Sequence, residues 1–383
     1  MEIQISKDEE QRLRAELENR TDFDALRMRR YLAMPDLSRT EGSPLAEIVK
    51  RVKAVPALAG FDVIEIPEIV PADISFDLFD FPTDHPARSQ SDTYYVDDKN
   101  ILRTHDTVFW YYYLHDPKIQ ERIAKGESMG AICYGKVYRK DEVDSRHMNV
   151  FHQLGGWYIA PDATPIEKAD LENALAEIAR SIFGDRAIRF NPDIFPYTDP
   201  SLELELNVKG TAAEGPAKGE WLELLGGGMP KKSVLKKMGV EGYHGWAFGF
   251  GLERIAIASM ALPDIRLLWS EDPRIKSQLV LGQEYHEVSK YPAIVRDISF
   301  IVPKTFVPNN YFDLVREVGG DLVEQVELLD KYENDEKFGA DKMSYAYRIT
   351  YRSLDRTLTG EEIDALHKKL EAETKTHFAA TVR

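Results

Sequence analysis

The most constraining feature of this sequence is the order of patterns over residues 289–383. Strand-like alternation in "AIVRDISFIV" precedes a helical run, "NYFDLVREVG"; two strand-like runs follow, then a second helical run and the short end "AATVR". This strand-helix-strand-strand-helix-strand order is typical of the split βαβ, ferredoxin-like arrangement. We therefore predict a separate domain over residues 289–383, with Thr359 and Glu362 as a capping box on its second helix.

The first 288 residues predict a second and larger domain, because 383 residues are too many for one comfortable core. A helix is expected to begin at Pro44 after Ser43, and the amphipathic run "DLENALAEIARSIFG" predicts a helix that ends at Gly184. The runs "FDVIEIPEI" and "DTYYVDDKNILRTH" and the alternation around Leu204 predict antiparallel strands set apart from the helices. The predicted fold class is α+β.

The N-terminal residues are predicted to form a helical extension over residues 1–42, followed by the main domain over residues 43–288. Residues 6–20 predict an exposed helix on a solvated flank, with Ser6 and Glu9 spaced as a capping box. The start of the chain is acidic and has neither an apolar signal core nor an Arg-rich transit pattern. We therefore predict a cytoplasmic protein.

The composition excludes several classes of protein. No run of about 18 apolar residues is present, so we expect no membrane span. A single cysteine, Cys133, excludes an internal disulfide and a multi-cysteine zinc site. The net charge of −16 argues against sequence-blind nucleic-acid binding but not against a local basic surface.

Two stretches gather the side chains that carry chemistry. In "VYRKDEVDSRHMNVFHQL", two strands joined by a loop would place Arg139 beside the group Phe151-His152-Gln153. In "GWAFGFGLERIAIASM", glycines let a ligand approach the backbone, and Arg254 opens an otherwise apolar helix. An arginine there needs an anion, either a phosphate or an acidic side chain. An alternative for the loop is a metal site, less favoured because the ligand spacing is uncommon; its ligands would be Asp141, Asp144, His147 and His152.

These motifs resemble the class II aminoacyl-tRNA synthetases. More narrowly, "FPTDHPAR", "LRTHDT", "FPYTDPS", "WAFGFGLERIA" and the tail "YRITYRSLDRTLTGEEI" are similar, in this order, to the phenylalanyl-tRNA synthetases. The likeness covers residues 43–383 and is to the single-chain, organelle-type form. It implies a class II antiparallel sheet flanked by helices, followed by a ferredoxin-like domain that binds the anticodon.

The resemblance also implies roles in forming an aminoacyl adenylate from ATP with Mg²⁺. Arg139 would hold the α-phosphate and Arg254 the γ-phosphate of a bent ATP. Catalysis would be positioning and charge stabilisation, with no protein nucleophile. The remaining residues assigned to ATP are Asp141 and His147 beside the nucleotide, Phe151 stacked on adenine, and Gly251, with Glu223 as a magnesium or ribose contact.

For phenylalanine, the resemblance implies a pocket with an aromatic end and a polar end. The aromatic walls are Phe195 and Tyr197, the floor is Ala247 and Gly249, and the polar end is His105, Thr107 and Gln153. Two departures from the family affect this pocket. "HQLGG" replaces the usual "HQLE", so Gly155 lacks a carboxylate expected to bind the amino group. "HDT" replaces "HTS", which leaves Asp106 as an alternative source of that charge, and the sequence does not decide between them.

The expected reaction joins phenylalanine to tRNA(Phe) through an aminoacyl adenylate, in a monomer. In the tail, Tyr345, Tyr347 and Tyr351 alternate with Arg348 and Arg352, an arrangement on which single-stranded RNA stacks and pairs. The alternative for these tyrosines is an ordinary core face. Two other functions stay open: a synthetase-like ligase for another aromatic acid, and a catalytically silent paralogue that binds tRNA.

Overall fold

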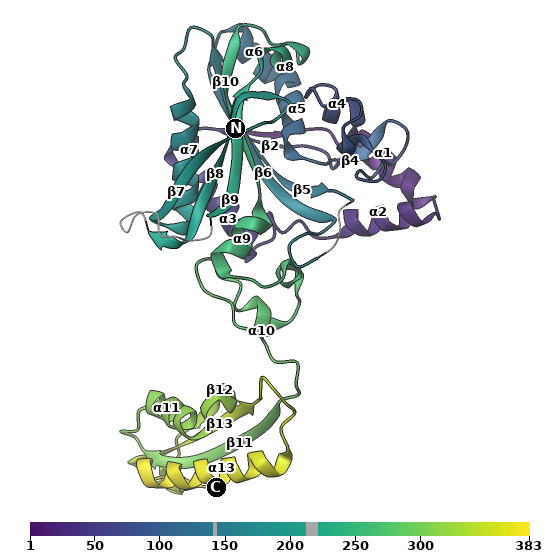
Figure 1. Cartoon of the computed structure of the whole chain (residues 1–383). Helices are drawn as coiled ribbons and strands as arrows, with labels where there is room; N and C mark the ends of the chain where they lie inside the picture. The colour runs from purple at the N-terminus through teal and green to yellow at the C-terminus, as the bar shows by residue number, and fades with distance from the viewer. Residues whose placement is uncertain (141–143, 212–220) are drawn as a thin grey trace. The chain divides into compact units, whose positions relative to one another are not determined.

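The computed structural model describes residues 1–140, 144–211 and 221–383, and the chain divides into two units (Figure 1). The first unit is Met1–Tyr285 and the second is His286–Arg383. No helix in the described part of the chain is long and apolar enough to span a membrane.

The first unit is built on one eight-stranded sheet in which strands from distant parts of the chain lie side by side (Figure 1). Its strands, in spatial order, are β1 (Glu2–Gln4), β2 (Asp62–Glu65), β5 (Met129–Tyr138), β6 (Val150–Pro161), β10 (Tyr243–Gly251), β9 (Trp221–Pro230), β8 (Thr198–Thr211) and β7 (Arg186–Asp193). From β5 to β7 every neighbour is antiparallel, which confirms the predicted antiparallel sheet for most of its width.

The edge of this sheet differs from the prediction. The run "FDVIEIPEI" divides into β2, which pairs in parallel with β5, and β3 (Ile69–Pro71), which pairs antiparallel with β4 (Asn100–Leu102). An antiparallel arrangement was wrong for β2. Alternation within a strand shows which side chains share a face, but it does not show the direction of the neighbouring strand.

Helices cover both faces of the sheet. The helices of this unit are α1 (Asp8–Glu18), α2 (Phe23–Ala33), α3 (Pro44–Lys53), α4 (Ala72–Phe76), α5 (Phe109–His115), α6 (Pro117–Ala124), α7 (Lys168–Phe183), α8 (Lys232–Lys237), α9 (Leu252–Met260) and α10 (Pro273–Lys276). On one face α7 contacts β7 to β10, and α3 joins α7 to α9. On the other, the indole rings of Trp110 in α5 and Trp157 in β6 stack 4.9 Å apart in the main core.

Two helix predictions in this unit are confirmed. The helix after Ser43 begins at Pro44, and the Ser43 hydroxyl accepts a hydrogen bond from the backbone N–H of Leu45. The amphipathic helix α7 buries its apolar stripe and ends at Gly184, whose φ of 68° is readily reached without a side chain.

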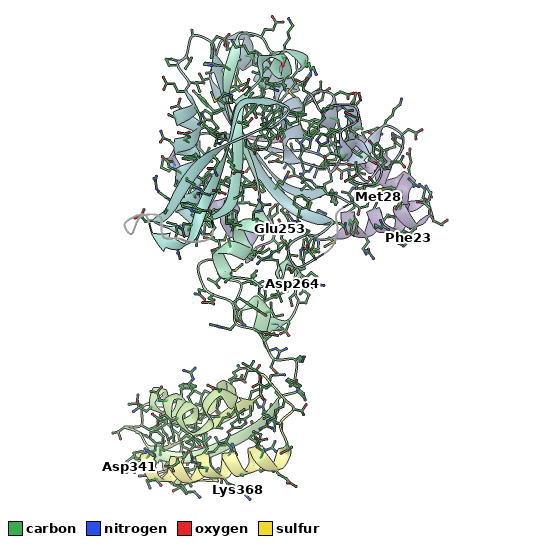
Figure 2. The ribbon with its side chains drawn as sticks, in the orientation of Figure 1. Phe23, Met28, Glu253, Asp264, Asp341 and Lys368 are labelled. Atoms are coloured by element: carbon green, nitrogen blue, oxygen red, sulfur yellow. The ribbon has the colours of Figure 1, made fainter. Side chains whose placement is uncertain are left out.

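The N-terminal residues are part of the first unit. Strand β1 pairs with β2, and α1 buries Leu13 and Leu17, so a solvated flank does not describe this helix. Helix α2 places Met28 in the same apolar cluster and leaves Phe23 exposed (Figure 2). The predicted capping box was wrong, because the N-cap of α1 is Lys7 and has no capping side chain.

The second unit has the predicted strand-helix-strand-strand-helix-strand order. Its elements are β11 (Ile294–Pro303), α11 (Pro308–Gly319), β12 (Val323–Tyr332), the short α12 (Asp335–Phe338), β13 (Lys342–Tyr351), α13 (Gly360–Phe378) and β14 (Thr381–Val382). The sheet order β12-β13-β11-β14 is that of a ferredoxin-like fold. Thr359 caps α13 by accepting from the backbone N–H of Glu362, as predicted.

The aromatic face of β13 belongs to the core of this unit. Tyr345, Tyr347 and Tyr351 are at most 2 % exposed and pack with Phe300 and Tyr311. The prediction that these tyrosines stack on RNA is therefore wrong. Burying three aromatic rings stabilises a domain of this size, so the apolar face of β13 is turned towards the helices.

Candidate active site

A cavity of about 1280 Å³ opens on the large sheet. It is lined by β6, β9 and β10, by the turn η3 (Asp106–Val108), by α9 and by the segment that carries Phe195 and Tyr197. Its volume exceeds the usual range for a single drug-sized ligand, so two ligands can lie in it together.

The floor of the cavity is a row of residues with almost no side chain. Register places Cys133 of β5 opposite Gly155 of β6, Gly155 opposite Gly249 of β10, and Gly249 opposite Gly226 of β9. Directly opposed residues project from the same face of a sheet. Gly155, Gly249 and Gly226 therefore form a trough across three strands, and Gly249 and Gly226 line the cavity itself, where a ligand can lie against the backbone.

Arginine side chains line part of the cavity. Arg139 follows β5, its Nε donates to the carbonyl of Thr104 at 3.2 Å, and its guanidinium lies 5.3 Å from the ring centre of Phe151. Arg254 in α9 is half exposed and forms an ion pair with Glu223 at 3.1 Å. An exposed ion pair of this kind is weak, so an anionic ligand can compete for Arg254.

A buried pair fixes α9 against β6. The Nδ1 of His152 lies 2.6 Å from Oε1 of Glu253, and the backbone N–H of His152 donates to the same carboxylate. Nε2 of His152 accepts from the backbone N–H of Leu37, so Nδ1 carries the proton. Glu253 is 3 % exposed at the start of α9 (Figure 2). This pair holds the helix that carries Arg254.

The alternative metal site is not assembled. His152 is fully buried with Glu253, whereas His147 is exposed and lies 3.0 Å from Asp144. Asp141 lies outside the described residues, and among those that are described no group of three His, Cys, Asp or Glu side chains could hold a metal ion.

Aromatic side chains also line the cavity. The rings of Phe195 and Tyr197 are stacked 6.0 Å apart, and the Tyr197 ring meets those of Phe81 and Trp110. A Cβ on Gly226 would stand 3.0 Å from the Phe195 ring, so this ring lies directly over the floor. Aromatic edges and faces around a flat floor suit a ring-shaped apolar group.

The turn η3 brings polar groups over the floor. The backbone N–H of Asp106 donates to Oε1 of Gln153 at 2.9 Å, which ties the turn to β6. Burial lowers the pKa of His105 to about 4, so the ring is neutral. Its Nε2 donates to the carbonyl of Ser75 at 3.1 Å, and its Nδ1 has no hydrogen-bond partner. Asp106 is 3 % exposed, and desolvation raises its pKa to about 7.

The structure brings most of the predicted site residues together in this cavity. Those that line it are His105, Thr107, Arg139, His147, Phe151, Gln153, Phe195, Tyr197, Glu223, Ala247, Gly249, Gly251 and Arg254. Arg348 and Arg352 lie in the second unit. Sequence reasoning missed the aromatic residues Phe81 and Trp110 and the glycines of β9. Three successive glycines inside a strand, "GGG" at 226–228, were the signal that could have revealed the floor.

Fold and cavity together define a class II aminoacyl-tRNA synthetase core. The chain belongs to this family: residues 31–279 match "tRNA synthetases class II core domain (F)", and residues 289–383 match "Ferredoxin-fold anticodon binding domain". The resemblance seen in the motifs is confirmed.

Named relatives narrow the family further. The chain is 38 % identical to the chloroplastic/mitochondrial phenylalanine--tRNA ligase of Arabidopsis thaliana, over 78 % of this chain and 68 % of that protein. It is 34 % identical to the mitochondrial enzyme of Mus musculus, over 75 % and 68 %. It is 35 % identical to a phenylalanine--tRNA ligase alpha subunit of Caldicellulosiruptor saccharolyticus, over 61 % and 67 %.

The names of these relatives correct one prediction. The acidic N-terminal segment suggested a cytoplasmic protein, but the similar single-chain enzymes of plant, mouse and Dictyostelium discoideum are named as mitochondrial or chloroplastic/mitochondrial. The cytoplasmic assignment is contradicted. Local composition near one end was too weak a signal to decide a compartment.

Proposed function

We propose that this protein attaches L-phenylalanine to tRNA(Phe) in two steps, with an aminoacyl adenylate as the intermediate. The observation that carries the proposal is a single cavity lined both by arginines and by stacked aromatic rings. The names of the relatives at 34–38 % identity support the same substrate pair.

The first step requires a carboxylate to attack the α-phosphate of ATP. Arg139 is proposed to hold that phosphate and Arg254 the γ-phosphate, because guanidinium groups bind phosphate oxygens with two parallel hydrogen bonds. Phe151 lies under the Arg139 guanidinium and offers a ring face for adenine. His147 and Gly251 line the same part of the cavity. Positioning and charge stabilisation then lower the barrier without a protein nucleophile.

The residues present fit a magnesium ion held chiefly by the nucleotide. Glu223 is an exposed carboxylate in the cavity beside Arg254. Mg²⁺ is commonly bound by one or two carboxylates together with substrate phosphates, so a single acid is sufficient here. Such an ion would supply positive charge to the leaving pyrophosphate.

The amino acid is proposed to lie across the strands. Its ring would rest between Phe195 and Tyr197, above Ala247 and Gly249. Its polar end would face Gln153, Thr107 and the neutral ring of His105. Each of these residues lines the cavity, which supports one continuous pocket.

We further propose that the two units have separate roles: the first makes the adenylate, and the second binds the anticodon of tRNA. Arg348 and Arg352 are the proposed contacts in the second unit. Arg348 is 45 % exposed and is held by Asp297, and Arg352 is held by Glu324. The protein is proposed to act as a monomer, which light scattering at assay concentration checks.

Exchange of labelled pyrophosphate into ATP, run with each of the twenty amino acids, tests the proposal. Phenylalanine should support exchange well above the other amino acids, and the loaded enzyme should then charge tRNA(Phe). Exchange with a different aromatic acid would favour the second candidate, a ligase for that acid, to which Gly155 and Asp106 in place of the usual family residues point. Absence of exchange with every amino acid would indicate a silent paralogue.

A further inference from the structure

Asp106 is an ionisable group that the proposed mechanism does not yet use. It stands at the start of η3, lines the cavity and is 3 % exposed. Its Oδ2 atom is buried and has no hydrogen-bond partner. A buried carboxylate oxygen without a donor is costly, so such an atom in a native protein calls for an explanation.

The carboxylate occupies the space that a side chain at position 155 would need. A Cβ on Gly155 would stand 2.0 Å from Oδ2 and 2.9 Å from Cγ of Asp106. A Cβ on Gly249 would stand 3.5 Å from Oδ1. The Asp106 carboxylate therefore lies over the paired glycines of β6 and β10, at the β6 end of the trough.

The groups around this carboxylate are two cations and two neutral side chains. Arg103 and Arg139 are the cations that act on it through space, and Cys133 and Tyr197 also face it. The Nε of Arg103 is engaged by the carbonyl of Lys136 at 2.8 Å. Neither arginine donates to Oδ2.

The other end of the trough is fixed by Phe195 over Gly226. Gly155 and Gly226 are separated by one strand, β10, which is a distance of about 10 Å. A single amino acid with an aromatic side chain can lie across β10, with its ring at Phe195 and its backbone atoms at Asp106.

We propose that Asp106 binds the α-ammonium group of the amino-acid substrate, and that Gly155 is the residue that gives its carboxylate room. This rests on the proposed function, because it assumes an amino acid in the trough. The ammonium would donate to the Asp106 carboxylate, and the N–H of Asp106 held by Gln153 would keep that carboxylate over the floor. A protein carboxylate then recognises the one group that distinguishes an amino acid from a plain aromatic acid.

Three ligands separate a binding role from a structural one: phenylalanine, phenylalaninol, which lacks the carboxylate, and 3-phenylpropionate, which lacks the ammonium. Their dissociation constants are measured by calorimetry for the full chain and for Asp106→Asn, which keeps the shape and removes the charge. The variant should bind phenylalanine and phenylalaninol roughly 10- to 100-fold more weakly, as expected for loss of a hydrogen bond to a charged group. Its affinity for 3-phenylpropionate should be unchanged or higher.

Asp62→Asn is the matched control. Asp62 is a buried acid of the same sheet, and it accepts hydrogen bonds from Arg122 and Tyr113, each at 2.7 Å. This variant should lose stability without changing the ratio of the three affinities.

Three results would overturn the inference. Equal weakening of all three ligands by Asp106→Asn would show a structural role, and unchanged affinities would show that the carboxylate does not meet the ammonium. If the unaltered protein bound neither phenylalanine nor phenylalaninol, both the inference and the proposed function would fail. If the unaltered protein bound these ligands and Asp106→Asn bound them with the same affinities, only the inference would fail and the proposed function would stand.

Discussion

The two sheets of this protein differ in how their charged side chains are paired. Over the large sheet, Asp106 is buried with an oxygen that accepts no hydrogen bond, and Arg254 has only a weak, exposed partner. In the second unit, Arg348 and Arg352 are each held by an acid on a neighbouring strand, and the aromatic rings of β13 are buried in the core. In the proposed function, ligands bring the opposite charges to the large sheet. In the small sheet, Arg348 and Arg352 are already paired with acids of the same unit.

The largest expected effect is on Arg254. Arg254→Ala should lower pyrophosphate exchange roughly 100- to 1000-fold, as for the loss of one charge-stabilising donor. The free energy of unfolding should change by no more than about 1 kcal/mol, because its ion pair with Glu223 is exposed. Arg266→Ala is the control, since Arg266 is exposed and paired with Asp264. It should leave exchange intact. A large fall in the melting temperature of Arg254→Ala would show a structural salt bridge instead.

The next effect concerns stability and pH at Asp106. Its folded-state pKa of about 7 lies above the ordinary value of 3.8, so the folded protein holds a proton that the unfolded chain releases. This favours the folded state below about pH 4, and the advantage is lost as the pH rises to 7. At pH 8, Asp106→Asn should therefore raise the free energy of unfolding by at most about 4 kcal/mol, and the melting temperature should rise with it.

The pH dependence supplies the check on that prediction. The increase in unfolding free energy caused by Asp106→Asn should become smaller as the pH falls from 7 and should vanish near pH 4. Asp62→Asn should destabilise the protein at neutral pH instead, because Asp62 has partners that would lose their charge complement. If both variants destabilised the protein alike at pH 8, the contrast between a satisfied and an unsatisfied acid would be wrong.

A moderate effect is expected at Ala247. Its methyl group is buried in the floor, opposite Trp157 of β6 and Gly228 of β9. Ala247→Gly should admit para-chlorophenylalanine and shift its exchange rate relative to phenylalanine by about 10-fold, the usual scale for one methylene in an apolar pocket. Identical rates for the two proteins would show that Ala247 does not limit the ring.

The smallest effects are expected in the second unit. Arg348→Ala should raise the Michaelis constant for tRNA a few-fold and leave pyrophosphate exchange unchanged. The slope of the logarithm of tRNA affinity against the logarithm of salt concentration should become smaller by about one. Asp297→Asn is the complementary variant. It releases Arg348 from its ion pair and should therefore lower the Michaelis constant for tRNA. If both variants left the constant unchanged, Arg348 would serve only to join β13 to β11.

Much of the fold followed from local pattern. The order of elements in the second unit, the helix α7 and the strands around Arg139 and Gln153 were predictable, because alternation and helical periodicity are properties of adjacent residues. The cavity residues were predictable only through motif resemblance. Composition and spacing alone left a metal site, a salt bridge and a phosphate site open.

The sequence by itself determined the class of protein, the two units and, through its motifs, many of the side chains that line the cavity over the large sheet. The tertiary structure decided how the strands pair and which side chains are buried. It placed β2 parallel to β5, packed α1 against α2 and β3, and turned the tyrosines of β13 inward. It also placed Asp106 over Gly155, which relates the two departures from the family to each other. The physical reason is that burial and steric exclusion act between residues far apart in the chain, and a linear pattern carries no record of which distant side chain fills a given space.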